Sequence, residues 1–101
     1  MDRTIKLSKR TTRKLEKLLE YLESEWSEKV KKDFIKKLDR SLNLIQGNPD
    51  SFEKTAIVKG LHRCVITKQT TIYYRYDKNF INIVTLFDTR QDHKNVKKEV
   101  R

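Results

Sequence analysis

The chain has 101 residues, of which 36% are hydrophobic and 38% are charged, and its formal net charge is +10. This length suits one compact domain with a small core. No apolar run approaches the roughly 20 residues that a membrane-spanning helix needs, and the N-terminus lacks the apolar stretch of a secretory signal. The single cysteine excludes an internal disulfide, and one cysteine with two separated histidines offers no zinc-ligand cluster. We therefore expect a cytoplasmic protein that uses no metal or other cofactor.

The positive charge is concentrated in the second half of the chain. Residues 1–53 contain 13 Lys and Arg against 10 Asp and Glu, whereas residues 54–101 contain 11 against 4. A polyanion or an acidic partner protein would be attracted to the second half. The alternative is that the basic charge serves solubility alone.

The first half predicts one short strand and two helices. Residues 3–7 alternate polar and apolar side chains, which suits a strand, and Ser8 is a plausible helix N-cap. Apolar residues then recur at helical spacing over 9–25 and again over 28–46. The two apolar stripes are Leu15, Leu19, Leu22 and Trp26 in the first helix, and Val30, Phe34, Leu38, Leu42 and Ile45 in the second.

The turn between these helices is very short, so they should form an antiparallel hairpin. Trp26 lies at its corner, and we expect it to anchor the core. Gly47 should terminate the second helix, with Pro49 just beyond it. Both apolar stripes then need a further apolar surface to pack against, and we expect a sheet to provide it.

The second half predicts that sheet. Residues 61–67, 71–77 and 80–89 are rich in β-branched and aromatic side chains and are separated by short turns. Sequential antiparallel hairpins are the simplest topology. Residues 91–101 form a polar tail. The predicted architecture is α+β, in the order β-α-α-β-β-β, with the helical hairpin on one face of an antiparallel sheet and the other face open to solvent or a ligand.

Four segments in this order resemble the RelE/ParE superfamily, the small toxins of bacterial type II toxin–antitoxin modules. They are "YLESEWS" (21–27), "NP" (48–49), "GLHRCVITKQTTIYYRY" (60–76) and "IVTLFDTRQ" (83–91). The similarity spans nearly the whole chain, so we take residues 1–101 as a single RelE/ParE-like domain.

The resemblance implies a cytosolic toxin that arrests growth unless a cognate antitoxin neutralises it. RelE-like toxins cut mRNA in the ribosomal decoding site, whereas ParE-like toxins poison DNA gyrase. The favoured prediction is a metal-independent, ribosome-dependent endoribonuclease. The alternatives are a ParE-like gyrase poison without nuclease activity, or an inactive binding module. Under either toxin prediction, the antitoxin should present an acidic, amphipathic segment to the basic sheet and the hairpin.

Metal-free RNA cleavage needs a base for the 2′-hydroxyl, cations for the phosphate and an acid for the leaving oxygen. Basic residues lie on or at the ends of all three C-terminal strands and in the adjoining loops. Residues of equal parity in neighbouring strands can share one face, so we expect Arg63 and Arg75 to share the open face with Arg90 at the strand exit. The candidate nucleic-acid-binding residues are Arg63, Arg75, Lys54 and Lys59.

The candidate catalytic residues are Arg90, Lys68 and His93. Arg90 matches the position at which RelE-like nucleases keep an arginine for the scissile phosphate, and Lys68 lies near another basic position of that pattern. His93 is the nearby side chain suited to proton transfer near neutrality. RelE-like nucleases usually have a tyrosine in the C-terminal segment, and residues 94–101 contain none, so a nuclease site here would be weakened.

Overall fold

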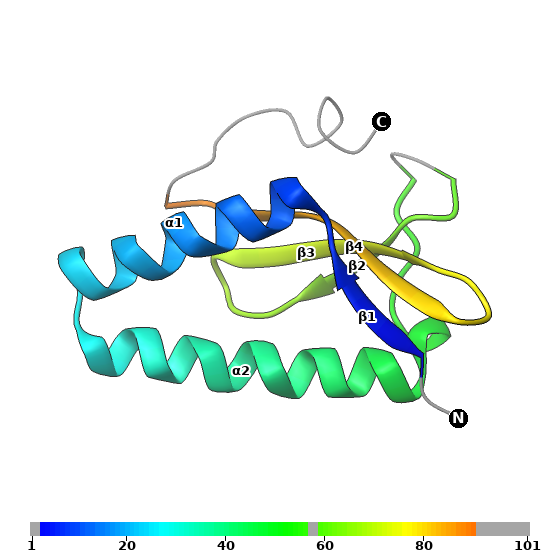
Figure 1. Cartoon of the computed structure of the whole chain (residues 1–101), viewed down its shortest axis with the longest axis horizontal. Coiled ribbons are helices and arrows are strands. Elements are labelled where there is room, and N and C mark those ends of the chain that lie inside the picture. The colour runs from blue at the N-terminus through cyan, green and yellow to red at the C-terminus, as the bar shows by residue number, and fades with distance from the viewer. Residues whose placement is uncertain (1–2, 57–58, 91–101) are drawn as a thin grey trace.

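The computed structural model describes residues 3–56 and 59–90. The elements, in chain order, are β1 (Thr4–Leu7), α1 (Lys9–Glu25), α2 (Glu28–Gly47), a 3-10 turn η1 (Pro49–Ser51), β2 (His62–Val65), β3 (Thr70–Tyr76) and β4 (Phe80–Asp88). The two helices lie alongside one another, and the strands lie against them (Figure 1). The predicted order β-α-α-β-β-β and the α+β class are confirmed.

Both helices begin where a serine caps them. The side chain of Ser8 accepts a hydrogen bond from the backbone N–H of Thr11, and that of Ser27 accepts one from Val30. Each bond satisfies one of the backbone donors that a helix N-terminus leaves unpaired. Gly47 is the last residue of α2 rather than the first residue beyond it, and Asn48 is the C-cap.

The sheet has the strand order β1-β4-β3-β2 and is mixed. β2 pairs antiparallel with β3, and β3 with β4, as predicted from the short turns between them. The predicted wholly antiparallel sheet is wrong at one edge, because β1 runs parallel to β4. No hairpin constrains β1, since both helices and two strands separate it from β4 in the sequence, so its direction depends on where the helices return the chain.

The core lies between the helical hairpin and one face of the sheet. Its helical members include Leu18, Leu22, Phe34, Leu38 and Ile45; its sheet members include Cys64, Ile72, Tyr74, Ile81, Ile83 and Leu86. Removing these apolar side chains from water is the main stabilising contribution to the layer packing. The prediction that Trp26 anchors this core is wrong, because Trp26 is 59% exposed. It follows α1 as its C-cap, where the helical periodicity no longer determines where a side chain points.

A β-bulge joins α1 to the middle of β4. The register between β3 and β4 shifts between Tyr73 and Tyr74, which leaves an extra residue in β4. The carbonyl of Ile83 accepts hydrogen bonds from the backbone of Ser8 and from the hydroxyl of Thr11, and the carbonyl of Val84 accepts one from the Ser8 hydroxyl. The start of α1 is thereby fixed beside the bulge, and the rest of the helix extends toward the end of β4 (Figure 1).

Candidate functional site

Two arginines share the sheet face that is turned away from the helices. Arg63 is paired with Tyr73 across β2 and β3, and Arg75 lies two residues further along β3, so all three side chains have the same facing. The same face carries a small apolar cluster of Leu61, Tyr73, Phe87 and Val84. The rings of Tyr73 and Phe87 meet edge to face at 6.0 Å between centroids. We call these six residues the open face; it is basic, but its aromatic side chains are largely buried, because Tyr73 and Phe87 are each only 7% exposed.

Within the described residues, no neighbouring acid neutralises the arginines of the open face. Among residues 3–56 and 59–90, neither Arg63 nor Arg75 has a carboxylate within ion-pair distance. The Lys14 ammonium group, from α1, lies 3.8 Å from the centroid of the Phe87 ring and adds a cation–π contact at the edge of the cluster. Because Tyr73 and Phe87 are buried, an anionic ligand would meet the partly exposed Arg63 and Arg75.

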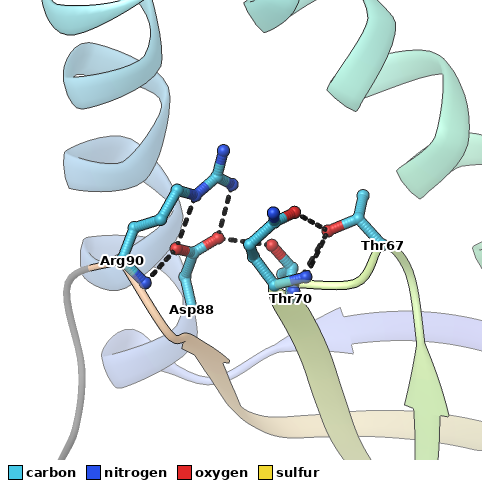
Figure 2. Close-up of polar contacts among 5 residues, drawn as sticks. Thr67, Thr70, Asp88 and Arg90 are labelled. Atoms are coloured by element: carbon cyan, nitrogen blue, oxygen red, sulfur yellow. Dashed lines mark hydrogen bonds and ion pairs between the residues drawn. The ribbon is translucent and has the colours of Figure 1, made fainter.

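Arg90 occupies a different environment. Its Nε donates to Oδ1 of Asp88 at 2.9 Å, and its Nη2 donates to Oδ2 at 2.7 Å, which makes a bidentate ion pair (Figure 2). The backbone N–H of Arg90 also donates to Oδ1, at 2.9 Å. The hydroxyl of Thr70, on the neighbouring strand, donates to Oδ2 at 2.5 Å. The guanidinium group is therefore held rigidly by a carboxylate that is itself fixed on two sides.

Burial and hydrogen bonding shift the pKa of Asp88 in opposite directions. Asp88 is only 1% exposed. Burial raises the pKa of Asp88, but the hydrogen bonds from Arg90 and Thr70 outweigh it and hold that pKa below its ordinary value. The same bond to Asp88 raises the pKa of Arg90. Both groups are consequently charged at neutral pH, and the charge of Arg90 is largely compensated within the protein.

The structure does not bring Arg90 together with Arg63 and Arg75. In Figure 2 its side chain extends from the end of β4 toward the two helices, and it lines a pocket with residues of α1 and α2. The expectation that three guanidinium groups converge on the open face is therefore wrong for Arg90. Asp88 has the same facing as the core residue Leu86, and the ion pair draws Arg90 to that side.

The predicted lysines lie in three separate exposed segments. Lys68 is in the turn between β2 and β3, whose neighbours Thr67 and Gln69 line the pocket beside Arg90. Lys54 makes an isolated antiparallel bridge with His62 along the outer edge of β2. Lys59 stands before Gly60 in the turn that leads into that strand. His93 lies outside the described residues.

His62 and Tyr74, two described side chains that could transfer protons, are engaged in the core. His62 is 2% exposed, contacts the Phe52 carbonyl through Nδ1 at 3.0 Å and stacks on Tyr74. The hydroxyl of Tyr74 donates to the Pro49 carbonyl at 2.6 Å, and burial raises the pKa of Tyr74. These contacts fasten the loop after α2 to the sheet, which is a structural role. Within residues 3–56 and 59–90, no three potential ligand side chains are grouped as a metal site, and no helix could span a membrane.

Sequence reasoning missed the partner of Arg90. The signal was the Asp-Thr-Arg order at the end of a buried strand, which places a carboxylate two residues before the guanidinium group. Asp88 ends β4 at a position where its side chain points to the same side as Leu86, and the chain then turns at residues 89 and 90. The spacing alone could not reveal that Thr70 would complete the arrangement.

Comparisons with known proteins agree with this fold. Residues 5–93 match the family model described as the ParE toxin of the type II toxin–antitoxin system parDE. A search of curated proteins finds no significant match. Among solved structures, a chain of the chromosomal ParDE toxin–antitoxin system from P. aeruginosa superposes with a TM-score of 0.69 at 13% identity, covering 85% of this chain and 95% of its own.

Two further solved structures have the same fold. The YoeB dimer structure from S. aureus gives a TM-score of 0.62 at 17% identity, covering 86% of this chain and 97% of its own. A chain of the E. coli DinJ–YafQ toxin–antitoxin complex gives 0.59 at 14% identity, covering 93% and 100%. At such identities the structures establish the fold alone, whereas the family model spans most of the sequence. The chain therefore belongs to the ParE toxin family, within the RelE/ParE superfamily of type II toxins.

Proposed function

We propose that this toxin arrests growth by binding a protein target, with DNA gyrase as the expected target of a ParE-like toxin, and that it does not cut mRNA. The observation that carries the proposal is the ion pair between Arg90 and Asp88. It occupies the one arginine that the resemblance to RelE-like nucleases assigns to the scissile phosphate. This reverses the order of preference that the sequence suggested.

The ion pair is a poor starting point for phosphate binding. Nε and Nη2 of Arg90, which together form one bidentate edge of the guanidinium group, are already bonded to Asp88. A phosphate that displaced Asp88 would leave a carboxylate that is 1% exposed without its charge partner, and breaking a buried ion pair in this way costs about 3 kcal/mol or more. Like Asp88, Tyr21 of α1 lies close enough to Arg90 to raise its pKa, but no described histidine or glutamate lines the pocket beside Arg90.

The endoribonuclease remains the second candidate because of the open face. Arg63 and Arg75 lie there without carboxylate partners among residues 3–56 and 59–90, and Lys54, Lys59 and Lys68 are exposed in other segments. Such a face could hold an RNA backbone. Under this alternative His93, which lies outside the described residues, would have to transfer the proton.

The antitoxin is the partner expected under both candidates. The open face presents the partly exposed cations Arg63 and Arg75, whereas its rings Tyr73 and Phe87 are each only 7% exposed. An acidic, amphipathic segment would place carboxylates on these arginines. Raising the salt concentration should weaken the complex of toxin and antitoxin, because exposed charge pairs are screened. Affinity that does not change with salt would show that charge does not direct the binding.

Parallel assays of the purified toxin test the two candidates. DNA gyrase should lose supercoiling activity as toxin is added, while a cell-free extract should continue translation without new mRNA ends. The double variant Arg63→Gln with Arg75→Gln tests whether either activity needs the open face, because neither arginine belongs to the core and the fold should survive. Cleaved mRNA together with normal supercoiling would refute the proposal and establish the endoribonuclease.

Arg90→Ala is a poor diagnostic of activity. Its loss of toxicity could reflect either a missing phosphate ligand or a destabilised strand end, since Asp88 would remain buried without its partner. A conservative change, Arg90→Lys, keeps the positive charge but loses the bidentate geometry. If Arg90→Lys remains fully toxic, Arg90 is not required as a bidentate phosphate ligand.

A further inference from the structure

A pocket lies at the corner of the molecule where the helical hairpin meets the turn between β2 and β3. Its volume is about 250 Å³. The apolar side chains Leu22, Val30 and Phe34 come from the two helices, and polar groups come from α2, the turn and the end of β4. The polar residues are Asp33, Lys37, Thr67, Gln69 and Arg90.

The pocket presents a fixed hydrogen-bond donor. Arg90 is bonded to Asp88 through Nε and Nη2, and Figure 2 shows its remaining nitrogen pointing away from Asp88. The Thr67 side chain accepts hydrogen bonds from the backbone N–H groups of Gln69 and Thr70, which fixes the turn on the other wall. A donor that is already ordered loses little entropy when it binds an acceptor.

An exposed tryptophan stands at the same corner. Trp26 is 59% exposed, and its backbone N–H donates to the carbonyl of Leu22, a pocket residue, at 3.1 Å. Tryptophan, tyrosine and arginine are enriched among the residues that contribute most to binding at protein interfaces. Trp26 does not line the pocket, but it lies in the turn between two residues that do, Leu22 and Val30.

We propose that this corner pocket receives one bulky apolar side chain of the antitoxin, whose adjacent carboxylate binds the free edge of Arg90 and Lys37. The inference rests on the proposed antitoxin partnership and adds a specific anchor to it. The volume is below the roughly 300 Å³ at which sites for whole small molecules begin, which favours a side chain over a cofactor. The apolar floor needs an apolar group, and the net charge of +10 favours an acidic partner.

Asp33 determines where the carboxylate can lie. It lines the pocket one helical turn before Lys37, and no ion pair joins the two side chains within the described residues. A partner carboxylate near Asp33 would be repelled, so it must lie on the side of Arg90 and Lys37. Asp33 can instead accept a backbone N–H of the bound segment.

A small probe tests this chemistry directly. N-acetyl-L-leucine carries the apolar side chain and the carboxylate; N-acetyl-L-leucinamide lacks the charge, and acetate lacks the apolar side chain. Trp26 is the only tryptophan of the chain, so its fluorescence reports binding at this corner. We expect the amide to bind roughly threefold more weakly than the acid, and acetate about tenfold more weakly. Equal binding of acid and amide, or no fluorescence change, would overturn the proposal.

Substitutions on α2 provide matched variants for the same titration. Lys37→Glu should weaken N-acetyl-L-leucine binding about threefold, whereas Lys36→Glu makes the same charge change at an exposed position that does not line the pocket. Asp33→Asn should strengthen binding, because it removes the repulsion. Equal effects of the two lysine substitutions would show only long-range charge attraction and would overturn the pocket assignment.

The complex separates this inference from the proposed function on which it rests. The antitoxin used is the protein that neutralises the toxin when the two are co-expressed and that co-purifies with it. Trp26→Ala should weaken the complex about tenfold or more, and Lys37→Glu should weaken it more than Lys36→Glu. A complex that forms with unchanged affinity in Trp26→Ala and Lys37→Glu overturns the pocket anchor and leaves the antitoxin partnership intact. The absence of any neutralising partner would overturn the partnership itself.

Discussion

The arginines of the two sheet faces differ in what surrounds them. Arg90, at the end of β4, is bound to a buried carboxylate and lies on the side of the helices, with 18% of its side chain exposed. Arg63 and Arg75 lie on the opposite face, where the described part of the chain gives them no carboxylate partner. Two of the three guanidinium nitrogens of Arg90 are engaged by the fold, whereas Arg63 and Arg75 have all of theirs available to a ligand within the described part of the chain.

This difference shows why a basic residue at a strand exit is weak evidence for a phosphate site. An arginine can stabilise the end of a strand by compensating an acid that the strand buries. Only the positions of neighbouring carboxylates distinguish that role from ligand binding. In this toxin the distinction separates the nuclease interpretation, which needs Arg90, from the protein-binding interpretation, which does not.

Loss of Arg90 should have the largest effect on stability. Arg90→Ala leaves Asp88 buried with only Thr70 as a side-chain donor, and we expect the free energy of unfolding to fall by about 3 kcal/mol. Urea denaturation measures the change. Asp88→Ala combined with Arg90→Ala should recover part of the loss, because no unpaired charge remains. If Arg90→Ala costs less than about 0.5 kcal/mol, the ion pair does not stabilise the fold.

Low pH should lower the stability that the ion pair between Asp88 and Arg90 contributes. The pKa of Asp88 is lower in the folded protein than the unfolded value of about 3.9. Its contribution to stability is therefore fully present above that value and is lost as the pH falls through the folded pKa. The urea-unfolding free energy of the wild type should drop more between pH 7 and pH 3 than that of Asp88→Asn. Equal drops would contradict a stabilising role for the ionised carboxylate.

Substitutions on the open face should lower antitoxin affinity and leave the stability of the fold nearly unchanged. Arg63→Gln with Arg75→Gln should change the free energy of unfolding by no more than about 0.5 kcal/mol, while antitoxin affinity falls and becomes less dependent on salt. Isothermal titration at two salt concentrations measures this. Loss of stability without loss of affinity would show that these arginines also serve the fold.

Trp26→Ala should have the smallest effect on stability. Because the side chain is 59% exposed, its removal should change the midpoint of urea unfolding by less than the matched change Leu22→Ala, which removes a fully buried side chain and costs about 3 kcal/mol. A Trp26→Ala variant as unstable as Leu22→Ala would mean that the indole is packed after all.

The sequence by itself determined the helices, the strand order along the chain and the side of each helix that is buried. These features depend on local rules: helical spacing of leucines, serine caps before α1 and α2, and short turns between β2, β3 and β4. The shared facing of Arg63 and Arg75 followed from the alternation of side chains along strands. The order of the sequence segments also indicated the family resemblance, which the family model confirms.

Only the tertiary structure decided which groups meet across the sheet and at its ends. The parallel pairing of β1 with β4, the ion pair that turns Arg90 toward the helices and the exposure of Trp26 all depend on contacts between segments far apart in the sequence. Thr70 and Asp88 are 18 residues apart and meet because β3 and β4 pair in one register. A local pattern specifies how a side chain is spaced along its own element, but not the charge, burial or acceptor that another element brings to it.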